Sequence, residues 1–464
     1  MAKLPTPQEL IASRPEFPSE PWLDIKPQFA PGSFCYPAKK ETMELLHMPN
    51  PHDWDPAAED WNLPENWEQI LCDAFEERLQ KHRSLKLFMD ICVRCGACAN
   101  VCPVFRLVGG HKMGYIYIGA IGLILTYFFH GKDKAKVLCQ NCVGCESCKN
   151  VCAGGIDLPR LIRGGVEGTL MAAVMKNRKM FHSLLKFASY AQKPFTGGTQ
   201  FQRHLPAMFL GKHGFKALPA IANEAFRDRW AKIAPRVATP RYRVAIFGGC
   251  AQDFIYPEQL EACVKVLGAR GVAVEYPMAQ TCCGLPLEMM GQRKTSVDVA
   301  KQNLEAFDAS KYDAIITLCA SCASHLKHVY PHILEGKADA ARVQLFSDKV
   351  TDYSSFVHDV LGLTEKDFNN SGEKVTYHAS CHICRGLGVT KAPRDLIADA
   401  ATYVPCAEED VCCGFGGTYS MKFPEISGTL LAKKLKHIEE TGASRVVMDC
   451  PGCVMQLRGG VEKQ

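Results

Sequence analysis

Short apolar runs alternate with longer amphipathic segments throughout the second half of the chain, after Pro240. The runs have the length and the β-branched content of strands, and several of them end just before a glycine or a cysteine. We expect strands at 243–247, 272–276, 313–318, 374–378 and 445–448, and a helix at 257–267. Such alternation is typical of an α/β layer with a largely parallel sheet. The sequence therefore predicts two α/β units, at 241–365 and 366–464.

The first half of the chain has a helical period instead. Apolar residues three and four positions apart predict a helix at 65–87, within an expected helical domain at 67–165. The basic segment 166–240 is expected to be a connector of helices and loops, broken near 194–199 and at Pro206 and Pro219. Residues 1–66 combine many prolines with tryptophans such as Trp22 and Trp54, which predicts an extended arm. The arm could lie on this chain's own globule or on a partner subunit.

One uncharged run, 113–129 (MGYIYIGAIGLILTYFF), is at the short limit for crossing a bilayer. The alternative is a buried helical segment. The run lies between two cysteine motifs that are expected to share their ligands between two clusters, and a membrane crossing would separate those motifs. We therefore expect a buried helix.

The composition bears on partners and on the redox compartment. The chain has 464 residues, 24 cysteines and a net charge of +5, and no block of lysine or arginine supports binding to nucleic acid. No apolar leader follows Met1, so we expect a reducing cytoplasm, where clustered cysteines are metal ligands rather than disulfides. No glycine fingerprint for flavin or NAD follows an expected strand, and no haem-attachment motif is present.

Two cysteine motifs in the first half have the spacing of ferredoxin-type [4Fe–4S] sites. In two-cluster ferredoxins, the fourth cysteine of each motif binds the other cluster. One cubane is thus expected on Cys92, Cys95, Cys98 and Cys152, and the other on Cys142, Cys145, Cys148 and Cys102. A zinc site would favour four ligands in two pairs, which is not the spacing of these motifs.

Ten further cysteines form one five-cysteine pattern that occurs twice with nearly the same gaps. The first copy is Cys250, Cys282, Cys283, Cys319 and Cys322, and the second is Cys381, Cys412, Cys413, Cys450 and Cys453. Both sets follow the ends of expected strands, where open α/β sheets place their sites. The adjacent cysteines suit a larger or split iron–sulfur cluster in which one thiolate bridges irons. A single cubane on four of the five thiols and a zinc site are the alternatives.

This pattern resembles the CCG domains of heterodisulfide reductase catalytic subunits. The phrases FCYPAKKETMELLHMPNPHDW, EDWNLPENWEQI and RSLKLFMDICVRCGAC resemble subunits of the HdrD, DsrK, TmcB and HmcF type. By contrast, VCPVFRLVGGHKMGYIYIGAIG resembles LutB and CCGFGGTYSMKFPEISGTLL resembles LutA, which are iron–sulfur subunits of a lactate oxidase related to the glycolate oxidase iron–sulfur subunit. Both five-cysteine copies are complete, which favours the heterodisulfide reductase type.

That resemblance implies a cytoplasmic subunit, peripheral to the inner membrane, with two [4Fe–4S] cubanes and one or two non-cubane [4Fe–4S] clusters. The subunit would exchange electrons between a quinone- or haem-binding membrane partner and a thiol/disulfide substrate. Other implied partners are a multihaem cytochrome, further iron–sulfur subunits and a small DsrC-like thiol protein. An iron–sulfur subunit of a lactate or glycolate oxidase is one alternative, and a non-catalytic electron relay is the other.

The second five-cysteine copy is expected to be the catalytic cluster site. Candidate proton donors beside it are His378, His382 and Lys422, each of which could instead be a surface or supporting residue. Backbone approach to the cluster, or simple turn formation, is expected of Gly414, Gly416 and Gly417. The remaining cysteines are expected to be buried thiols, with Cys384 as the first candidate for a spare ligand. They are Cys35, Cys72, Cys139, Cys263, Cys384 and Cys406.

Overall fold

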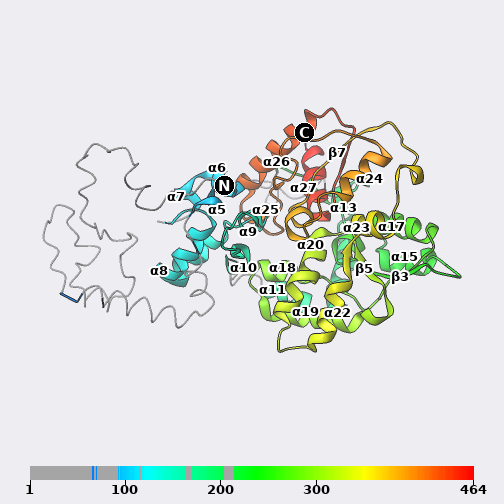
Figure 1. Ribbon diagram of the computed structural model, residues 1–464, viewed down its shortest axis with the longest axis horizontal. Helices are drawn as coiled ribbons and strands as arrows, with labels where there is room; N and C mark the ends of the chain where they lie inside the picture. Colours follow the sequence, from blue (N-terminus) through cyan, green and yellow to red (C-terminus); the bar gives the residue numbers. More distant parts are fainter. Residues whose placement is uncertain are drawn as a thin grey trace, which may run out of the picture. The chain divides into compact units, whose positions relative to one another are not determined.

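The computed structural model divides the chain into two compact units, residues 1–83 and 84–464. It describes residues 95–113, 117–162, 169–202 and 214–463, together with positions 65, 66, 69 and 92. The expected arm at 1–66 and the expected helix at 65–87 therefore lie almost entirely outside the described residues. Figure 1 shows the chain, with labels on many of the helices and strands of residues 84–464.

Short helices and turns build the segment that carries the ferredoxin-type motifs. Gly96 and Glu146 have left-handed φ angles of 75° and 61° at equivalent places in the two motifs, one residue before a short helix. The helices are α5 (Ala97–Asn100), α6 (Pro103–Val108), α7 (Gly110–Met113), α8 (Gly119–Cys139), α9 (Ser147–Asn150) and α10 (Leu158–Ile162). The backbone therefore turns sharply within each motif and brings its cysteines together.

The long apolar run lies largely in α8, with Leu123 and Ile124 buried in the packed interior. The helix bends at Gly131, whose φ is 80°. Among the described residues, no helix is both long enough and apolar enough to cross a bilayer. The expectation of a buried helix is confirmed for this part of the run.

The connector is mostly helical. Its helices are α11 (Thr169–Lys176), α12 (Arg178–Ala191), α13 (Lys193–Thr196) and α15 (Phe226–Ile233). Asn177 caps α12, because its side-chain oxygen accepts a hydrogen bond from the backbone N–H of Met180 at 3.1 Å. Two features differ from the expectation of helices and loops alone. α13 fills the start of the predicted break at 194–199, and β1 (Phe201–Gln202) pairs antiparallel with β2 (Leu218–Pro219).

The first α/β unit has a four-stranded parallel sheet in the order β4-β3-β5-β6. Its strands are β3 (Tyr242–Ile246), β4 (Val272–Glu275), β5 (Ala314–Thr317) and β6 (Val350–Asp352). Ile246 and Ile316 on one face of the central strands and Ala245 and Ile315 on the other are all fully buried, so the sheet is covered on both faces. The helices are α16 (Ala251–Phe254), α17 (Pro257–Ala269), α18 (Leu285–Met289), α19 (Arg293–Ala306), α20 (Ala320–Ser324), α21 (Tyr330–Ile333), α22 (Ala340–Lys349) and α23 (Tyr353–Ser355). The helical turns are η2 (Ala309–Lys311), η3 (His325–Val329), η4 (Phe356–Val360) and η5 (Glu365–Asp367).

The second α/β unit repeats this plan with a smaller parallel sheet in the order β8-β7-β9. Its strands are β7 (Lys374–Tyr377), β8 (Thr402–Tyr403) and β9 (Arg445–Val447), and its helices are η6 (His382–Gly386), α24 (Ala392–Ala400), α25 (Tyr419–Lys422), α26 (Pro424–Glu439) and α27 (Pro451–Val461). Equivalent backbone bonds follow the central strands of both units. The N–H of Phe247 donates to the carbonyl of Ile316 at 2.8 Å, and the N–H of His378 donates to the carbonyl of Val447 at 2.9 Å. These bonds align the two copies residue by residue, and the expected duplicated α/β module is confirmed.

Candidate iron–sulfur sites

The ferredoxin-type thiols fall into two groups. Cys98 interacts electrostatically with Cys92, Cys95 and Cys152, whereas Cys102 interacts with Cys142 and Cys145. Cys148 interacts most strongly with Cys142, Cys145 and Cys102, and more weakly with Cys98 of the other group. These are the sets that the cross-ligation rule predicts for two cubanes. Burial raises the pKa of the Cys102 thiol to about 12, so a bound metal would be needed to hold it as a thiolate at neutral pH.

All ten cysteines of the duplicated pattern line one cavity of about 190 Å³. We call Cys250, Cys282, Cys283, Cys319 and Cys322 the first site, and Cys381, Cys412, Cys413, Cys450 and Cys453 the second site. Nine of these ten residues are buried, and Cys250 is partly buried. Cys145 of the ferredoxin-type segment lines the same cavity and interacts electrostatically with Cys381. One ferredoxin-type thiol set is therefore adjacent to the second site.

The thiols of the two sites form one continuous series of contacts. The order is Cys250, Cys282, Cys283, Cys322, Cys319, Cys450, Cys453, Cys413, Cys412 and Cys381. The second half of this series repeats the first half in reverse. Two equivalent cysteines, Cys319 and Cys450, meet at its centre, so the two sites adjoin through equivalent residues.

A polar side chain lies at this junction. The Ser321 hydroxyl is 3.2 Å from the Cys450 Sγ and 3.0 Å from the His382 Nδ1. The other ring nitrogen of His382, Nε2, is 3.9 Å from a carboxylate oxygen of Glu146, in the ferredoxin-type segment. The position equivalent to Ser321 is Gly452, where a Cβ would lie 2.9 Å from the ring of Phe415. The junction is thus asymmetric, although the cysteines around it are symmetric.

Buried side chains fix the backbone beside each adjacent cysteine pair. In the first site, the Asn303 Nδ2 donates to the carbonyl of Cys282 at 2.8 Å, and the Tyr330 hydroxyl donates to the carbonyl of Cys283 at 2.9 Å. In the second site, the Gln456 Nε2 donates to the carbonyl of Cys413 at 3.2 Å. Because these partners are themselves buried, they hold the cysteine backbone in one conformation.

The second cysteine of each pair is electrostatically distinct. A hydrogen bond from the Cys282 thiol lowers the pKa of Cys283 to about 6, and a hydrogen bond from Cys412 lowers the pKa of Cys413. The symmetry of the sites places these two thiols at equivalent positions. Each therefore becomes a thiolate, the form that binds metal, more readily than the cysteine that precedes it.

Close backbone approach occurs at the glycines around the cavity. The backbone N–H of Gly414 points at the Cys412 Sγ at 3.4 Å, and Gly416 and Gly417 line the cavity with φ angles of 51° and 61°. A Cβ at Gly249 would lie 3.4 Å from the Cys322 Sγ. At Gly414 and Gly416 an added Cβ would instead meet Leu430 and Tyr419 at 2.9 and 2.8 Å, so these two glycines allow close packing of the backbone beside the cavity.

The donor set fits iron–sulfur clusters. Five cysteines per site line one cavity, which exceeds the four ligands that a structural zinc ion takes. Metal–thiolate bonds would also offset the unfavourable energy of ionising so many buried, closely packed thiols. A cluster bound at each site would accept and release single electrons, and the buried hydrogen bonds to the cysteine carbonyls would keep its ligands in place.

The three candidate proton donors lie in different surroundings. His382 lines the cavity, as described above. His378 is 1% exposed, and one of its ring nitrogens lies within 4.8 Å of the Cys413 and Cys453 sulfurs. Burial lowers the pKa of His378 to about 3, so its imidazole is neutral at physiological pH. Lys422 is exposed at the end of α25 and does not line the cavity, because α25 turns that residue to the surface.

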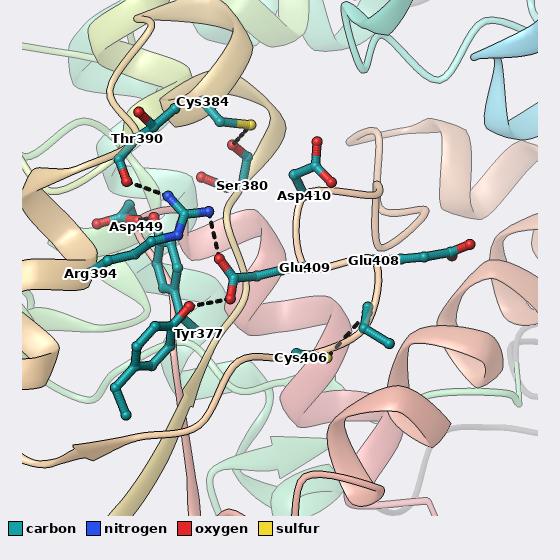
Figure 2. Close-up of polar contacts among 12 residues, drawn as sticks. Tyr377, Ser380, Cys384, Thr390, Arg394, Cys406, Glu408, Glu409, Asp410 and Asp449 are labelled. Carbon is teal, nitrogen blue, oxygen red and sulfur yellow. Dashed lines mark hydrogen bonds and ion pairs between the residues drawn. The ribbon is translucent and has the colours of Figure 1, made fainter.

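Of the six cysteines outside the motifs, four lie within the described residues, and none of these four lines the cavity. The Cys384 thiol donates to the carbonyl of Ser380 at 3.3 Å, and the Cys406 thiol donates to the carbonyl of Ala407 at 3.4 Å, as Figure 2 shows. Cys263 is packed in the core of the first α/β unit, and burial raises the pKa of Cys139 to about 12. Cys35 and Cys72 lie outside the described residues.

Sequence reasoning missed several residues of the site. Ser321 occupies the Cys-x-x-Cys loop of the first copy, and an alignment of the two copies would have shown that its counterpart is Gly452. Glu146 lies beside Cys145, but its approach to His382 depends on the docking of distant segments. Lys216 of the connector reaches the second site through Gln456, with 2.6 Å between the Lys216 Nζ and the Gln456 Oε1. No local signal in the sequence marks that contact.

Comparison with known proteins agrees with this geometry. The CCG cysteine-rich domain family matches residues 244–327 and 375–458, and the 4Fe-4S dicluster domain family matches residues 88–156. The probable glycolate oxidase iron-sulfur subunit of Bacillus subtilis (strain 168) is 26% identical over 421 residues, covering 84% of this chain and 92% of that protein. Lactate utilization protein A of Oceanobacillus iheyensis is 35% identical over 225 residues, covering 48% of this chain and 91% of that protein. The corresponding protein of Geobacillus sp. (strain WCH70) is 34% identical over 226 residues, covering 48% and 93%.

These matches confirm the expected CCG domains and the resemblance to lactate and glycolate oxidase subunits. They also confirm [4Fe–4S] clusters as the cofactors of an oxidoreductase subunit that transfers electrons. Because Lactate utilization protein A shares more than 30% of its residues with this chain over nearly its whole length, the family is established. The chain therefore belongs to the family of iron–sulfur proteins with paired CCG cysteine-rich domains that includes Lactate utilization protein A.

Proposed function

We propose that this chain is the iron–sulfur subunit of an oxidoreductase that oxidises a 2-hydroxy acid such as lactate or glycolate. The observation that carries the electron-transfer part is the shared cavity, in which Cys145 lies beside the ten thiols of the two CCG sites. The hydroxy-acid part is supported by the names of the relatives, one of which aligns with 84% of this chain. The sequence predicts no flavin or NAD site here, so a partner subunit would remove the hydride.

The cysteine sets of the chain would then hold the clusters of an electron relay. Cys92, Cys95, Cys98 and Cys152 form the outer thiol set, and the set that contains Cys145 is next to the second CCG site. The first site follows through the contact between Cys319 and Cys450. The buried partners Asn303, Tyr330 and Gln456 keep these thiols fixed, so that little rearrangement accompanies each transfer.

A second candidate is a thiol/disulfide function of the heterodisulfide reductase type, in partnership with a quinone- or haem-binding membrane subunit and a multihaem cytochrome. One observation favours it: both CCG sites have all five cysteines, and they face one cavity. A disulfide needs two electrons, and two adjacent sites could supply one each. The Ser321 hydroxyl, between Cys450 and His382, would be the polar contact for a substrate sulfur at the junction.

The test is anaerobic addition of substrates to the protein isolated with its copurifying partners, while the visible absorption and the EPR spectrum of the clusters are recorded. Bleaching by lactate or glycolate, but not by thiols or disulfides, is the result that we expect. A change in the CCG signals caused by a dithiol or disulfide, without any effect of hydroxy acids, would support the second candidate instead. A response to a low-potential electron donor alone would overturn both and leave a non-catalytic relay.

A further inference from the structure

The two CCG sites have equivalent thiols but different charged surroundings. Two positions of the second copy carry cations where the first copy has none, since Arg385 and Lys434 are equivalent to Phe254 and Asn303; the neutral His378 is equivalent to Phe247. The equivalence of His378 and Phe247 rests on their matching backbone bonds to β9 and β5. The helices α26 and α19 also match, since the hydroxyls of Ser427 and Ser296 donate to the carbonyls of Gly414 and Gly284 at 2.8 and 3.4 Å.

Lys434 is a buried cation whose hydrogen-bond partners are neutral. It is 3% exposed, and its Nζ donates to the backbone carbonyls of Glu408 and Glu409. The carboxylates of these two residues have other partners. Glu408 pairs with Lys433 at 2.7 Å, whereas Glu409 pairs with Arg394 at 2.5 Å and accepts from the Tyr403 hydroxyl; Figure 2 shows Glu409 directed toward Arg394. Burial lowers the pKa of Lys434, and the nearby thiols of Cys406, Cys413, Cys412 and Cys381 act in the opposite direction.

Lys216 has the same character on the connector side of the second site. It is 7% exposed, and its Nζ donates to the Gln456 Oε1 at 2.6 Å and to the Ser420 hydroxyl at 2.9 Å, which are both neutral acceptors. Its Nζ also lies 4.9 Å from the centre of the Phe415 ring, and Phe415 lines the cavity. Burial lowers the pKa of Lys216 to about 8, and the Cys413 thiolate acts in the opposite direction.

Arg385 adds a third cation between the ferredoxin-type segment and the second site. It interacts electrostatically with Cys381, Cys384 and Cys145. Its ion pair with Asp410, at 3.1 Å, is at the surface, because the Asp410 side chain is 58% exposed. The structure thus places buried positive charge beside one thiol set, whereas the equivalent set has Phe254 and Asn303 at the positions of Arg385 and Lys434.

Buried charge without a close opposite charge is unfavourable, and the unfavourable energy falls when negative charge is added nearby. Reduction of an iron–sulfur cluster by one electron adds one negative charge. Net charge and hydrogen bonding around the sulfurs are among the factors that set cluster potentials. The buried lysines therefore favour the reduced state of the second site over that of the first.

We propose that the second CCG site has the higher reduction potential of the two and is the one that exchanges electrons with the adjacent ferredoxin-type cubane, because the buried Lys216 and Lys434 stabilise the added charge there. One electron leaves the cubane on Cys102, Cys142, Cys145 and Cys148, and one electron arrives at the second site; no bond is formed or broken. The inference requires clusters in both CCG sites but does not depend on the substrate proposed above. Its failure can therefore be distinguished from the failure of that function.

The test is a potentiometric titration of the cluster-loaded full chain, followed by EPR. The variants Cys283→Ser and Cys413→Ser assign the two CCG signals, because each removes one thiol ligand from one of the two sites. We expect the signal lost in Cys413→Ser to have the higher midpoint potential. In Lys434→Met, the ratio of reduced to oxidised second site at a fixed potential should fall about tenfold, which is 59 mV for one electron. The first-site signal should stay unchanged.

Lys433→Met is the matched control. Lys433 directly precedes Lys434 in α26, is 49% exposed and pairs with Glu408. It loses the same charge and should shift neither signal. Lys434→Gln and Lys216→Gln keep a polar side chain and serve if a methionine variant does not fold, which the cubane signals would report. A higher potential at the first site would overturn the inference, and so would equal shifts at both sites or an equal effect of Lys433→Met.

A second readout needs no electron transfer. In cluster-free protein the buried lysines lack the negative charge that they face in the loaded protein. Lys434→Met should therefore raise the thermal midpoint of the cluster-free chain relative to Lys433→Met, and lower that of the loaded chain. The same sign of change in both states would contradict the assignment.

Discussion

Cys319 and Cys450, which follow equivalent strands of the two copies, meet at the boundary between the two thiol sets. Each follows a parallel strand, β5 or β9, and is the residue before a helix, α20 or α27. Because the contact joins equivalent residues, the two sites adjoin at matching positions and line one cavity. The duplication therefore produces a single ten-thiol cavity rather than two separate sites.

The docking of the ferredoxin-type loop depends on Gly416. Its φ is 51°, and a Cβ there would lie 2.8 Å from the Tyr419 Cβ and 2.9 Å from Val143 Cγ2. We expect Gly416→Ala to push the loop of Cys145 away from the second site and to slow electron transfer between them, as measured by flash photoreduction. The left-handed backbone alone should destabilise the fold by about 1–2 kcal/mol.

Gly388→Ala separates these effects, because Gly388 has a φ of 73° with no atom within 4 Å of the added Cβ. It has the same backbone penalty without the collision, so its transfer rate should equal that of the wild type. Equal slowing in both variants would show that the close approach at Gly416 does not position the loop.

Cys384 should be dispensable for cluster binding, although it lies three residues after a ligand. Its thiol donates to the Ser380 carbonyl, and serine can make the same bond. We expect Cys384→Ser to keep the iron content and the EPR signals of the wild type, whereas Cys381→Ser should lose those of the second site. Loss of iron in Cys384→Ser would make Cys384 a ligand in the loaded protein.

The sequence predicted the local parts of this site well. Strand patterns such as RVAIF before Cys250 and DAIITL before Cys319 placed the ligands at strand ends, and the motif spacing gave the two groups of ferredoxin-type thiols. It could not predict how distant segments meet. Three features depend on packing between segments that are distant in the sequence, and such packing leaves no periodic signal along the chain. They are the contact of Cys319 with Cys450, the position of Cys145 at the cavity and the contact of Lys216 with Gln456.

The placement of Cys250 depends on a buried ion pair. Asp253, three residues further on in α16, is fully buried, and its carboxylate is 2.6 Å from the Arg227 Nη2 and accepts from the Tyr276 hydroxyl at 2.9 Å. We expect Arg227→Met to lower the free energy of unfolding by about 3–5 kcal/mol, since it leaves a buried carboxylate without its cation. Chemical denaturation measures this.

The neighbouring pair of Lys186 and Asp228 provides the control. These side chains are 58% and 38% exposed, at 3.2 Å. Lys186→Met should change the free energy of unfolding by less than about 1 kcal/mol. An Arg227→Met effect as small as this would show that Asp253 is stabilised without Arg227.

The stability of the connector should depend on pH through His182. Burial lowers the pKa of His182 to about 3, and the Arg227 Nη1 lies 3.0 Å from its Nδ1, which therefore accepts and is unprotonated. The unfolded histidine has a pKa near 6.5. Because the folded pKa is depressed, the stabilisation is complete above about pH 6.5 and declines as the pH falls toward 3.

The measurement is the free energy of unfolding of the wild type and His182→Gln between pH 5 and pH 7. We expect the wild type to lose stability more steeply on acidification, because the carboxylates common to both proteins cancel in the difference. Parallel curves would mean that His182 titrates normally in the folded protein.

Iron and acid-labile sulfide per chain, determined anaerobically, test the central claim that this cavity holds two clusters beside two cubanes. At about four irons per cluster, the account predicts roughly 16 iron atoms in the wild type and roughly 12 in either Cys283→Ser or Cys413→Ser. A wild-type value of roughly 8 in intact protein, unchanged in both variants, would contradict the account, because the ten thiols would then bind no iron.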